Sequence, residues 1–423
     1  MRASEQDGRL IRRWRRLPII RAFLFAVGGL LTLQAAIVTV LSVVVARQRK
    51  RRRLAEGFPH IHLHEVTVGE NHLRVYDYGR DLYDAMIAAI EYAKECIYVE
   101  SFIWKDDPVG QEFKEHLARK AREGVAVYVI FDSFGNLVVP RAFKCFSPEI
   151  HTMEYHALTR PWHFFDPRRY ALDHRKLLVV DGRIAFIGGY NIGNLYATEW
   201  RDTHLRIRGP AAADLAQSFV DFWNNASRKR NRIKRHYQRR FDPLIALHGT
   251  NAMRLTFPIR DMYIEAIDRA ERRILLTNAY FIPDHILLEA LKAAAERGVE
   301  VHVLLPWHSN HIIADWLARG YFMDCLRAGI RIFGYQGAMI HAKTCTIDGQ
   351  WSTIGTANLD RLSSVGNYEI NVEIYSAELA DQMEQLFEND KTNAFELTVE
   401  KWITRPWYAE LSERVLAPLR FAL

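Results

Sequence analysis

Two short stretches, HRKLLVVDG at 174–182 and HAKTCTIDG at 341–349, decide how this chain folds. Each begins with a histidine that is followed by a lysine at +2 and an aspartate at +7. The agreement continues downstream, because both copies have a glycine at +14 and an asparagine at +17. At +28 the first copy has an aspartate and the second a glutamate. Six matched positions in copies 167 residues apart indicate an internal duplication. A single H-x-K would carry little weight.

The duplication extends upstream of the two motifs. Residues 89–132 and 266–306 each read as a helix, an apolar strand, a second amphipathic helix and another apolar strand. Gly124 and Gly298 stand where the second helix should end. Near-continuous apolar strands that alternate with helices predict a mostly parallel, buried α/β sheet in each copy. We therefore divide the chain into one half at 60–245 and a second at 246–423.

The N-terminal region predicts a membrane anchor. Residues 22–46 form a run of 25 residues without a charge, which as a helix spans about 37 Å and is long enough to cross a bilayer. A cleaved signal peptide is the alternative, but a basic linker at 47–59 follows instead of a cleavage site. The flank at 1–21 is similarly basic. The positive-inside rule is therefore nearly tied, and the cytoplasmic side is our working assignment for the catalytic region.

The net charge of +7 is concentrated in this region. Residues 1–53 contain thirteen Arg or Lys and two acidic residues, so the rest of the chain has a charge of about −4. This distribution predicts contact with an anionic membrane surface and argues against nucleic-acid binding by the body. A second basic run at 228–240 is either an exposed linker or the end of the preceding helix. The four cysteines show no disulfide or zinc spacing.

The matched polar residues suit phosphodiester chemistry. A histidine and a lysine two positions apart on a strand project to the same face, so two halves together supply two imidazoles and two ammonium groups. One neutral imidazole can attack phosphorus while the other, protonated, serves as the general acid. Side-chain donors from Lys176, Lys343, Asn191 and Asn358 would then hold the phosphoryl oxygens. This arrangement requires no metal and no cofactor.

Carboxylates complete the candidate site. Asp202 and Glu369 share one offset, and we expect them to orient the imidazoles through the outer ring nitrogen. Asp181 and Asp348 belong to the motifs but precede glycine, so we interpret them as turn and support residues. The candidate catalytic residues are His174, Lys176, Asp181, His341, Lys343 and Asp348, supported by Asn191, Asn358, Asp202 and Glu369.

The paired segments HRKLLVVDG…GGYN and HAKTCTIDG…GTAN resemble the phospholipase D superfamily. The phrases WRDTHLRIRGP, NAYFIPD and GNYEINVEIY are similar to its cardiolipin synthase branch. The resemblance covers roughly residues 73–386 and implies a pseudo-twofold α/β sandwich with both motifs at the interface between its halves. It also implies that a phosphatidyl group is transferred between two phosphatidylglycerol molecules in a bacterial inner membrane, through a phosphohistidine. His174 would be the nucleophile and His341 the acid, although the symmetry of the motifs leaves that assignment open.

Three alternatives to a phosphatidyltransferase remain from the sequence. A phospholipase D hydrolase would use the same residues and release phosphatidic acid. A nuclease is suggested only by the basic runs, and a scaffold with a dead site conflicts with two intact motifs. The oligomeric state stays open.

Weaker signals lie outside the motifs. The histidines at 60, 62 and 64 alternate, which favours an exposed strand face over a metal site. The aromatic segment 162–165 precedes the first motif and is a candidate lining for an acyl-chain entrance. Trp402 and Trp407 belong either to an interfacial helix or to the packed domain.

Overall fold

The computed structural model describes residues 22, 25–29, 32–40, 43, 57–157, 170–227, 229–251, 254–361, 363 and 366–418. Within these ranges no helix is both long enough and apolar enough to span a bilayer. The predicted anchor at 22–46 lies partly outside the described residues, and the segments 1–21, 47–56 and 162–165 lie outside them entirely.

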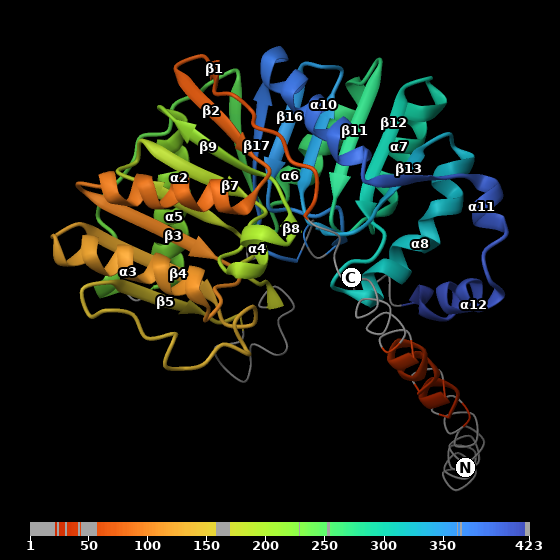
Figure 1. Cartoon of the computed structure of the whole chain (residues 1–423), viewed down its shortest axis with the longest axis horizontal. Helices are drawn as coiled ribbons and strands as arrows, with labels where there is room; N and C mark the ends of the chain where they lie inside the picture. Colours follow the sequence, from red (N-terminus) through yellow and green to blue (C-terminus); the bar gives the residue numbers. More distant parts are fainter. Residues whose placement is uncertain are drawn as a thin grey trace, which may run out of the picture.

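The chain forms two eight-stranded sheets (Figure 1). Across the first sheet the strands are β1 (Val66–Val68), β2 (Asn71–Tyr76), β9 (His204–Arg208), β7 (Ile184–Gly188), β6 (Leu177–Val180), β3 (Cys96–Ser101), β4 (Ala126–Asp132) and β5 (His151–Tyr155). Across the second they are β10 (Ile245–Gly249), β17 (Ile370–Tyr375), β16 (Trp351–Gly355), β15 (Lys343–Ile347), β11 (Arg273–Asn278), β12 (Glu300–Pro306), β13 (Arg331–Tyr335) and β18 (Ala394–Leu397). Seven strands follow the same order in both, from β2 to β5 in the first sheet and from β10 to β13 in the second. The duplication in the sequence is thus a duplication of the fold.

The prediction of mostly parallel sheets is wrong. In the first sheet only the β3–β4 and β4–β5 pairs are parallel, and in the second only β11–β12 and β12–β13. The other pairs are antiparallel, and the motif strands β6 and β7, like β15 and β16, are joined by turns. A parallel pair needs a crossover of a dozen or more residues, and the connections at 102–125, 133–150, 279–299 and 307–330 provide it.

Helices cover both faces of each sheet, which explains the continuous apolar strands. The outer faces pack against α2 (Gly79–Tyr92), α3 (Pro108–Arg122) and α4 (Asn194–Thr198) in the first half, and against α6 (Pro258–Arg269), α7 (His285–Glu296) and α8 (Ile312–Arg327) in the second. The inner faces pack against α5 (Ala211–Ala226) and α10 (Ala377–Lys391), and one apolar cluster there contains residues from both sheets. Along β3, Ile97 and Val99 face outward, whereas Cys96 and Tyr98 face the inner cluster.

The segment that joins the halves is an exposed linker. Helix α5 ends at Ala226, before the basic run begins. One 3-10 turn, Lys229–Asn231, is followed by irregular chain up to β10. The sequence left two interpretations of the basic run at 228–240. The structure agrees with a linker and not with a continuation of the preceding helix.

The described N-terminal residues contact the C-terminal helix beside α8. Helix α12 (Trp407–Leu416) packs on α8 and follows the short α11 (Val399–Ile403). From the N-terminal segment, the Gln34 side chain donates a hydrogen bond of 3.0 Å to the carbonyl of Val415. Trp402 is buried at 4% exposure, whereas Trp407 is 75% exposed. Trp402 therefore packs inside the domain, whereas Trp407 lies at the surface.

Candidate active site

The two motifs meet where the backbones of the two halves join. Strand β14 (Met339–Ile340), just before His341, pairs in parallel with β8 (Trp200–Arg201) of the first half. The backbone N–H of His341 donates to the carbonyl of Arg201 at 2.6 Å, and that of His174 donates to the carbonyl of Tyr368 at 3.1 Å. Each histidine is therefore tied to the other half, at the residue that precedes the carboxylate of that half.

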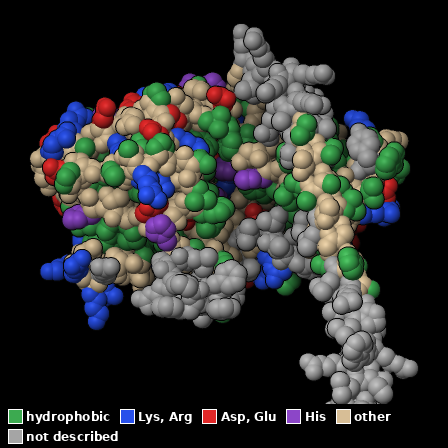
Figure 2. All heavy atoms as spheres, turned by 90° about the horizontal axis from the view of Figure 1, so that it is seen from below, with side chains coloured by type: hydrophobic (Ala, Val, Ile, Leu, Met, Phe, Trp, Pro, Cys, Tyr) green, Lys and Arg blue, Asp and Glu red, His purple; other side chains and the backbone are tan. Residues whose placement is uncertain are grey.

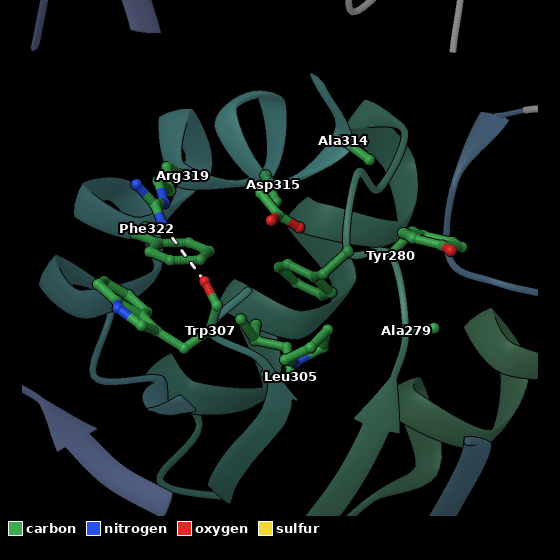
Figure 3. Close-up of a pocket in the computed structure, with 11 residues that line it drawn as sticks. Ala279, Tyr280, Leu305, Trp307, Ala314, Asp315, Arg319 and Phe322 are labelled. Atoms are coloured by element: carbon green, nitrogen blue, oxygen red, sulfur yellow. Dashed lines mark hydrogen bonds between the residues drawn. The ribbon is translucent and has the colours of Figure 1, made fainter. Parts of the chain in front are cut away.

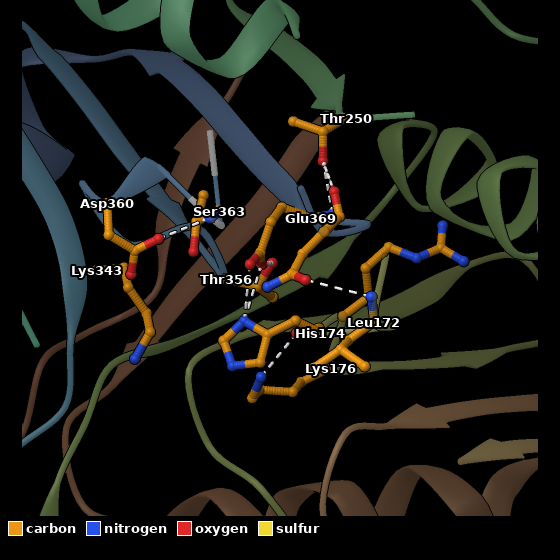
Figure 4. A network of polar contacts seen from close by, with 12 residues as sticks. Leu172, His174, Lys176, Thr250, Lys343, Thr356, Asp360, Ser363 and Glu369 are labelled. Atoms are coloured by element: carbon orange, nitrogen blue, oxygen red, sulfur yellow. Dashed lines mark hydrogen bonds and ion pairs between the residues drawn. The ribbon is translucent and has the colours of Figure 1, made fainter. Parts of the chain in front are cut away.

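The carboxylates contact the histidines across the same interface. Nδ1 of His174 lies 2.9 and 3.0 Å from the two carboxylate oxygens of Glu369 (Figure 4). Nδ1 of His341 lies 2.6 Å from Oδ2 of Asp202. A ring that donates its Nδ1–H to a carboxylate leaves Nε2 free for chemistry. The structure thus shows the predicted pairing of imidazole and carboxylate, but each carboxylate orients the histidine of the other half.

Buried hydrogen bonds hold both carboxylates in place. Glu369 accepts a hydrogen bond of 2.5 Å from the Thr356 hydroxyl. Asp202 accepts one of 2.7 Å from the backbone N–H of Thr203. The glycine at +14 makes room for the strand that carries each carboxylate. A Cβ on Gly188 would lie 2.4 Å from the carbonyl oxygen of Thr203, and one on Gly355 would lie 2.1 Å from Oδ1 of Asn371.

Both lysines point toward their histidines from extended backbone. His174 and Lys176 precede β6, and Lys343 is the first residue of β15, so the lysine side chains stand at the strand entrances. Nζ of Lys176 donates to the carbonyl of His174 at 2.7 Å, and Nζ of Lys343 lies 2.9 Å from Nδ1 of His341. The shared face that the H-x-K spacing predicted is present, although it lies ahead of the strands.

Burial dominates the ionisation of the cluster. It lowers the pKa of Lys176 to about 7 and that of Lys343 to about 8. Burial, reinforced by the lysines, lowers the pKa of His341 to about 3 and that of His174 well below its ordinary value. Cationic groups in a buried site are costly without a counter-ion. A phosphate group would supply that counter-ion.

The two carboxylates differ in acidity. Burial raises the pKa of Glu369 to about 8. Burial acts on Asp202 in the same direction, but Lys343 and His341 outweigh it and the pKa of Asp202 is lowered. An ionised carboxylate stabilises an imidazolium at its partner. His341 beside Asp202 is therefore better placed to carry a proton than His174 beside Glu369.

The two predicted asparagines are buried, at 2% and 5% exposure. Oδ1 of Asn191 accepts a hydrogen bond of 3.0 Å from the backbone N–H of Ile103, which fixes the orientation of the amide. Asn358 is buried, and its Oδ1 has no hydrogen-bond partner among the described residues. Buried amides can donate N–H groups to an anion.

The structure does not bring the motif aspartates to the site. Asp181 and Asp348 lie at the far ends of β6 and β15 in positive-φ turns, with φ of 53° and 55°. The Asp181 carboxylate accepts the backbone N–H groups of residues 94, 95 and 96, and Asp348 accepts those of 271, 272 and 273. These contacts fasten the turns to the starts of β3 and β11. Both residues therefore hold the fold, as the turn interpretation expected, and they do not belong among groups that touch a substrate.

Sequence reasoning missed several groups around the histidines. The ring of Phe102 lies 4.8 Å from that of His174, and the rings of Trp200 and Tyr280 lie 5.2 and 6.1 Å from that of His341. Asp360 is buried, accepts the backbone N–H of Ser363 at 2.6 Å, and has its pKa raised to about 7 by burial (Figure 4). A comparison of offsets could have singled out Asp360, because the first copy has Gly193 at that position.

A pocket adjoins the site on the side of the second half (Figure 3). Tyr280 lines it and also contacts His341. Opposite Tyr280, Arg319 lies over the rings of Trp307 and Trp316 at 4.7 and 4.6 Å and donates to the carbonyl of Trp307 at 3.3 Å. The pocket therefore combines an aromatic wall with a guanidinium, and its Tyr280 lies against the imidazole of His341.

Metal-ligating side chains do not gather elsewhere in the described ranges. Those ranges contain no group of three or more His, Cys, Asp or Glu that could hold a metal ion. His60, His62 and His64 are exposed, as predicted, but their segment forms no strand. His60 stacks on Tyr78, while His62 and His64 contact Asp81 and Glu378.

Comparisons with known proteins agree with this geometry. A family model described as "Cardiolipin synthase, PLD-like domain" matches residues 86–223 and 263–391. A cardiolipin synthase of Listeria welshimeri is 34% identical over 380 residues, which cover 84% of this chain and 76% of that protein. Cardiolipin synthase A of Pseudomonas putida is 34% identical over 79% of this chain and 71% of that protein. Among solved structures, phosphatidylserine synthase of Haemophilus influenzae shares the fold, with a TM-score of 0.62 at 17% identity over 83% of this chain and 93% of that one.

Proposed function

Because this chain belongs to the PLD-like cardiolipin synthase family, we propose that it transfers a phosphatidyl group from one phosphatidylglycerol molecule to a hydroxyl of a second. The products are cardiolipin and glycerol. The observation that carries the proposal is the pair of imidazoles in one buried site, each oriented by a carboxylate from the opposite half. Two such groups are what a double displacement at phosphorus requires.

In the first step Nε2 of His174 attacks the phosphorus of the donor lipid. The bond from phosphorus to the glycerol oxygen breaks, and His341 gives its proton to that oxygen. Glycerol leaves, and the phosphatidyl group stays on His174 as a phosphohistidine. We assign the acid role to His341 because ionised Asp202 raises its affinity for a proton. Burial and Lys343 hold the pKa of His341 at about 3 without a ligand, and the anionic phosphate of the bound lipid would oppose both effects.

In the second step His341, now neutral, removes a proton from the hydroxyl of a second phosphatidylglycerol. The oxygen attacks phosphorus, the bond to His174 breaks, and cardiolipin leaves. Lys176 and Lys343 hold the non-bridging oxygens through both steps, with Asn191 and Asn358 as neutral donors. These four groups come equally from the two halves, so the phosphoryl group sits on the pseudo-twofold axis.

We further propose that residues 22–46 anchor the enzyme in a bacterial inner membrane as a single transmembrane helix, with the catalytic region on the cytoplasmic side. The run of 25 residues without a charge supports this. Its basic flanks would attract anionic headgroups.

A phospholipase D hydrolase is the alternative, since water in place of the second lipid would release phosphatidic acid from the same phosphohistidine. The test is mass spectrometry of lipids after the full-length chain is incubated with phosphatidylglycerol vesicles. We expect cardiolipin as the main product, phosphatidic acid as a minor one, and no loss of rate with EDTA. The His174→Ala, His341→Ala double variant provides the background. Phosphatidic acid with barely detectable cardiolipin would establish the hydrolase, and loss of activity with EDTA that zinc or magnesium restores would refute the metal-free site.

A further inference from the structure

The loop between β4 and β5, residues 133–150, presents large apolar side chains to solvent. Phe134, Leu137 and Val138 are 59%, 69% and 82% exposed, all within five residues. We propose that this β4–β5 loop inserts into the surface of an anionic bilayer and holds the mouth of the active site against the lipid. The proposal deepens the proposed function and rests on it, because it names a part of the chain that brings a lipid substrate to the site.

Buried polar contacts hold the loop in this conformation. Oδ1 of Asp132 accepts the backbone N–H groups of Phe134 and Gly135 at 2.8 and 3.0 Å. The Asn136 side chain is 1% exposed and donates to the carbonyl of Asp132 at 2.7 Å. Buried polar side chains therefore stabilise the turn, and its apolar side chains are exposed to solvent. Exposed large apolar groups on a well-anchored turn indicate an interaction surface.

The same two polar residues connect the loop to the catalytic histidine. Oδ2 of Asp132 accepts the backbone N–H of Asp173, the residue before His174, at 2.9 Å. Asn136 donates to the carbonyl of Phe102 at 2.8 Å, and the Phe102 ring lies against the His174 ring. The position of the loop tip is thus fixed relative to the reacting imidazole. Insertion of the tip would place His174 at the level of the lipid headgroups.

The charge of the loop favours an anionic lipid surface as its occupant. The loop has two basic residues, Arg141 and Lys144, and one acidic residue, Glu149. Lys144 pairs with Glu154 at 2.9 Å. Arg141 is exposed next to the apolar tip. Apolar side chains flanked by basic ones are typical of segments that lie in the interface of anionic membranes.

The loop lies on the edge of the molecule where the other lipid-facing features gather. In Figure 1 the gold β4–β5 loop lies along the lower edge of the molecule, as do α8, α12 and the described part of the N-terminal helix. Seen from that edge, histidine and basic side chains lie in a cleft between the halves, with hydrophobic side chains on both sides (Figure 2). On α12, Trp407 and Leu411 are exposed. One flat bilayer can therefore contact both halves around the cleft.

Membrane depth of the loop tests the proposal without turnover. Val138→Cys and, as a matched control, Tyr92→Cys are made in a Cys145→Ser background, since Cys145 is the exposed thiol among the four free cysteines. Tyr92 is 78% exposed and is the last residue of α2. It lies just before the start of β3, and therefore at the opposite end of the strands from the β4–β5 loop. Each full-length variant carries a nitroxide and is reconstituted in phosphatidylcholine–phosphatidylserine vesicles. We expect position 138 to be protected from an aqueous nickel chelate and accessible to oxygen, with position 92 fully aqueous. Equal aqueous exposure of the two positions would overturn the proposal.

A rate comparison tests the consequence for substrate delivery. For Leu137→Asp we expect the ratio of the rate on phosphatidylglycerol vesicles to the rate on monomeric short-chain phosphatidylglycerol to fall at least tenfold. Tyr92→Asp should leave the ratio unchanged. An unchanged ratio in Leu137→Asp, or protection of position 138 by an added protein partner instead of vesicles, would refute lipid docking. Failure of the proposed function looks different, since the nitroxide at 138 would still insert while no cardiolipin forms.

Discussion

Arg201 and Asp390 form a bidentate ion pair across the interface between the halves, with Nε to Oδ1 at 2.8 Å and Nη2 to Oδ2 at 2.7 Å. The two side chains are 1% and 2% exposed. Arg201 precedes Asp202, and its carbonyl accepts the backbone N–H of His341. The ion pair therefore fixes a carboxylate of one half and a histidine of the other at the same time.

Loss of this pair should cost more stability than loss of an exposed one. Asp390→Ala leaves a buried guanidinium unpaired, and we expect the free energy of unfolding to fall by about 3–5 kcal/mol. The control is Glu396→Ala, because Glu396 pairs with Arg331 at 2.7 Å at the surface. That change should cost about 0–1 kcal/mol. Urea unfolding of the detergent-solubilised protein measures both, and equal losses would show that Arg201 does not depend on Asp390.

The two histidines should fail in different ways. His174→Ala and His341→Ala should each lower turnover by several orders of magnitude. Only His341→Ala retains the nucleophile, so only this variant should accumulate a phosphatidyl-enzyme when an activated leaving group allows the first step. Intact-protein mass spectrometry after acid-free quenching detects the adduct. An adduct on the His174→Ala protein instead would reverse the two roles.

Each carboxylate contacts the histidine of the opposite half. This leads to a prediction that would not follow if each carboxylate contacted the histidine of its own half. Asp202→Asn should resemble a defect of His341, and Glu369→Gln a defect of His174, although each carboxylate lies in the opposite half. A phosphatidyl ester of p-nitrophenol needs little help from a general acid, so it should restore the first-step burst in Asp202→Asn and not in Glu369→Gln. Rapid-quench measurement of nitrophenol release compares the two. Equal restoration in both variants would contradict separate roles for the two carboxylates.

The lysines set the alkaline limit of the activity. In the free enzyme the pKa of Lys176 is about 7 and that of Lys343 about 8. As the pH rises through these values the site loses positive charge, so kcat/KM should fall on the alkaline side with an apparent pKa between 7 and 8. Lys176→Arg keeps its charge far above this range. In this variant the alkaline fall of kcat/KM should therefore occur at a higher pH, even if the maximum rate is lower. A limb at the same pH in the variant would show that another group sets the limit.

The same shift makes Lys176 destabilising. Its folded pKa lies below the unfolded value near 10.5, so the folded chain binds fewer protons between about pH 7 and 10, and the cost of burying the charge is greatest below pH 7. Lys176→Met should raise the melting temperature by a few degrees at pH 6 and by much less at pH 10, while it abolishes activity. Thermal melts at the two pH values test this. A gain that grows with pH would refute the sign.

The sequence allowed three features to be predicted: the repeat, the meeting of the two histidines and two lysines in one site, and the contacts of Asp202 and Glu369 with the imidazoles. Those inferences depended on spacing within each half, which a duplicated sequence displays directly. It did not allow the crossing of the carboxylates to be predicted, because offsets describe one half at a time and the contact joins residues 195 positions apart. The mixed sheets were missed for a related reason. Apolar strands read alike in parallel and antiparallel sheets once both faces are covered.

The single residues that sequence reasoning missed have no repeated signal. Phe102 and Trp200 touch the imidazoles through ring packing, which leaves no pattern in a chain rich in aromatics. Asp360 has no counterpart in the first half. Asp181 and Asp348 show the opposite case, since they repeat strictly yet serve the turns. A residue that repeats in both halves is one that both halves require, and the requirement can be structural as well as chemical.

The crossed pairing also bears on the chain during its synthesis. The first histidine is complete long before the ribosome reaches residue 369, but until then its imidazole has no carboxylate to fix its tautomer. We therefore expect a nascent or truncated first half to have no activity on lipids. Activity would then appear only when the second half has been made and has docked on the first, which supplies the missing carboxylate.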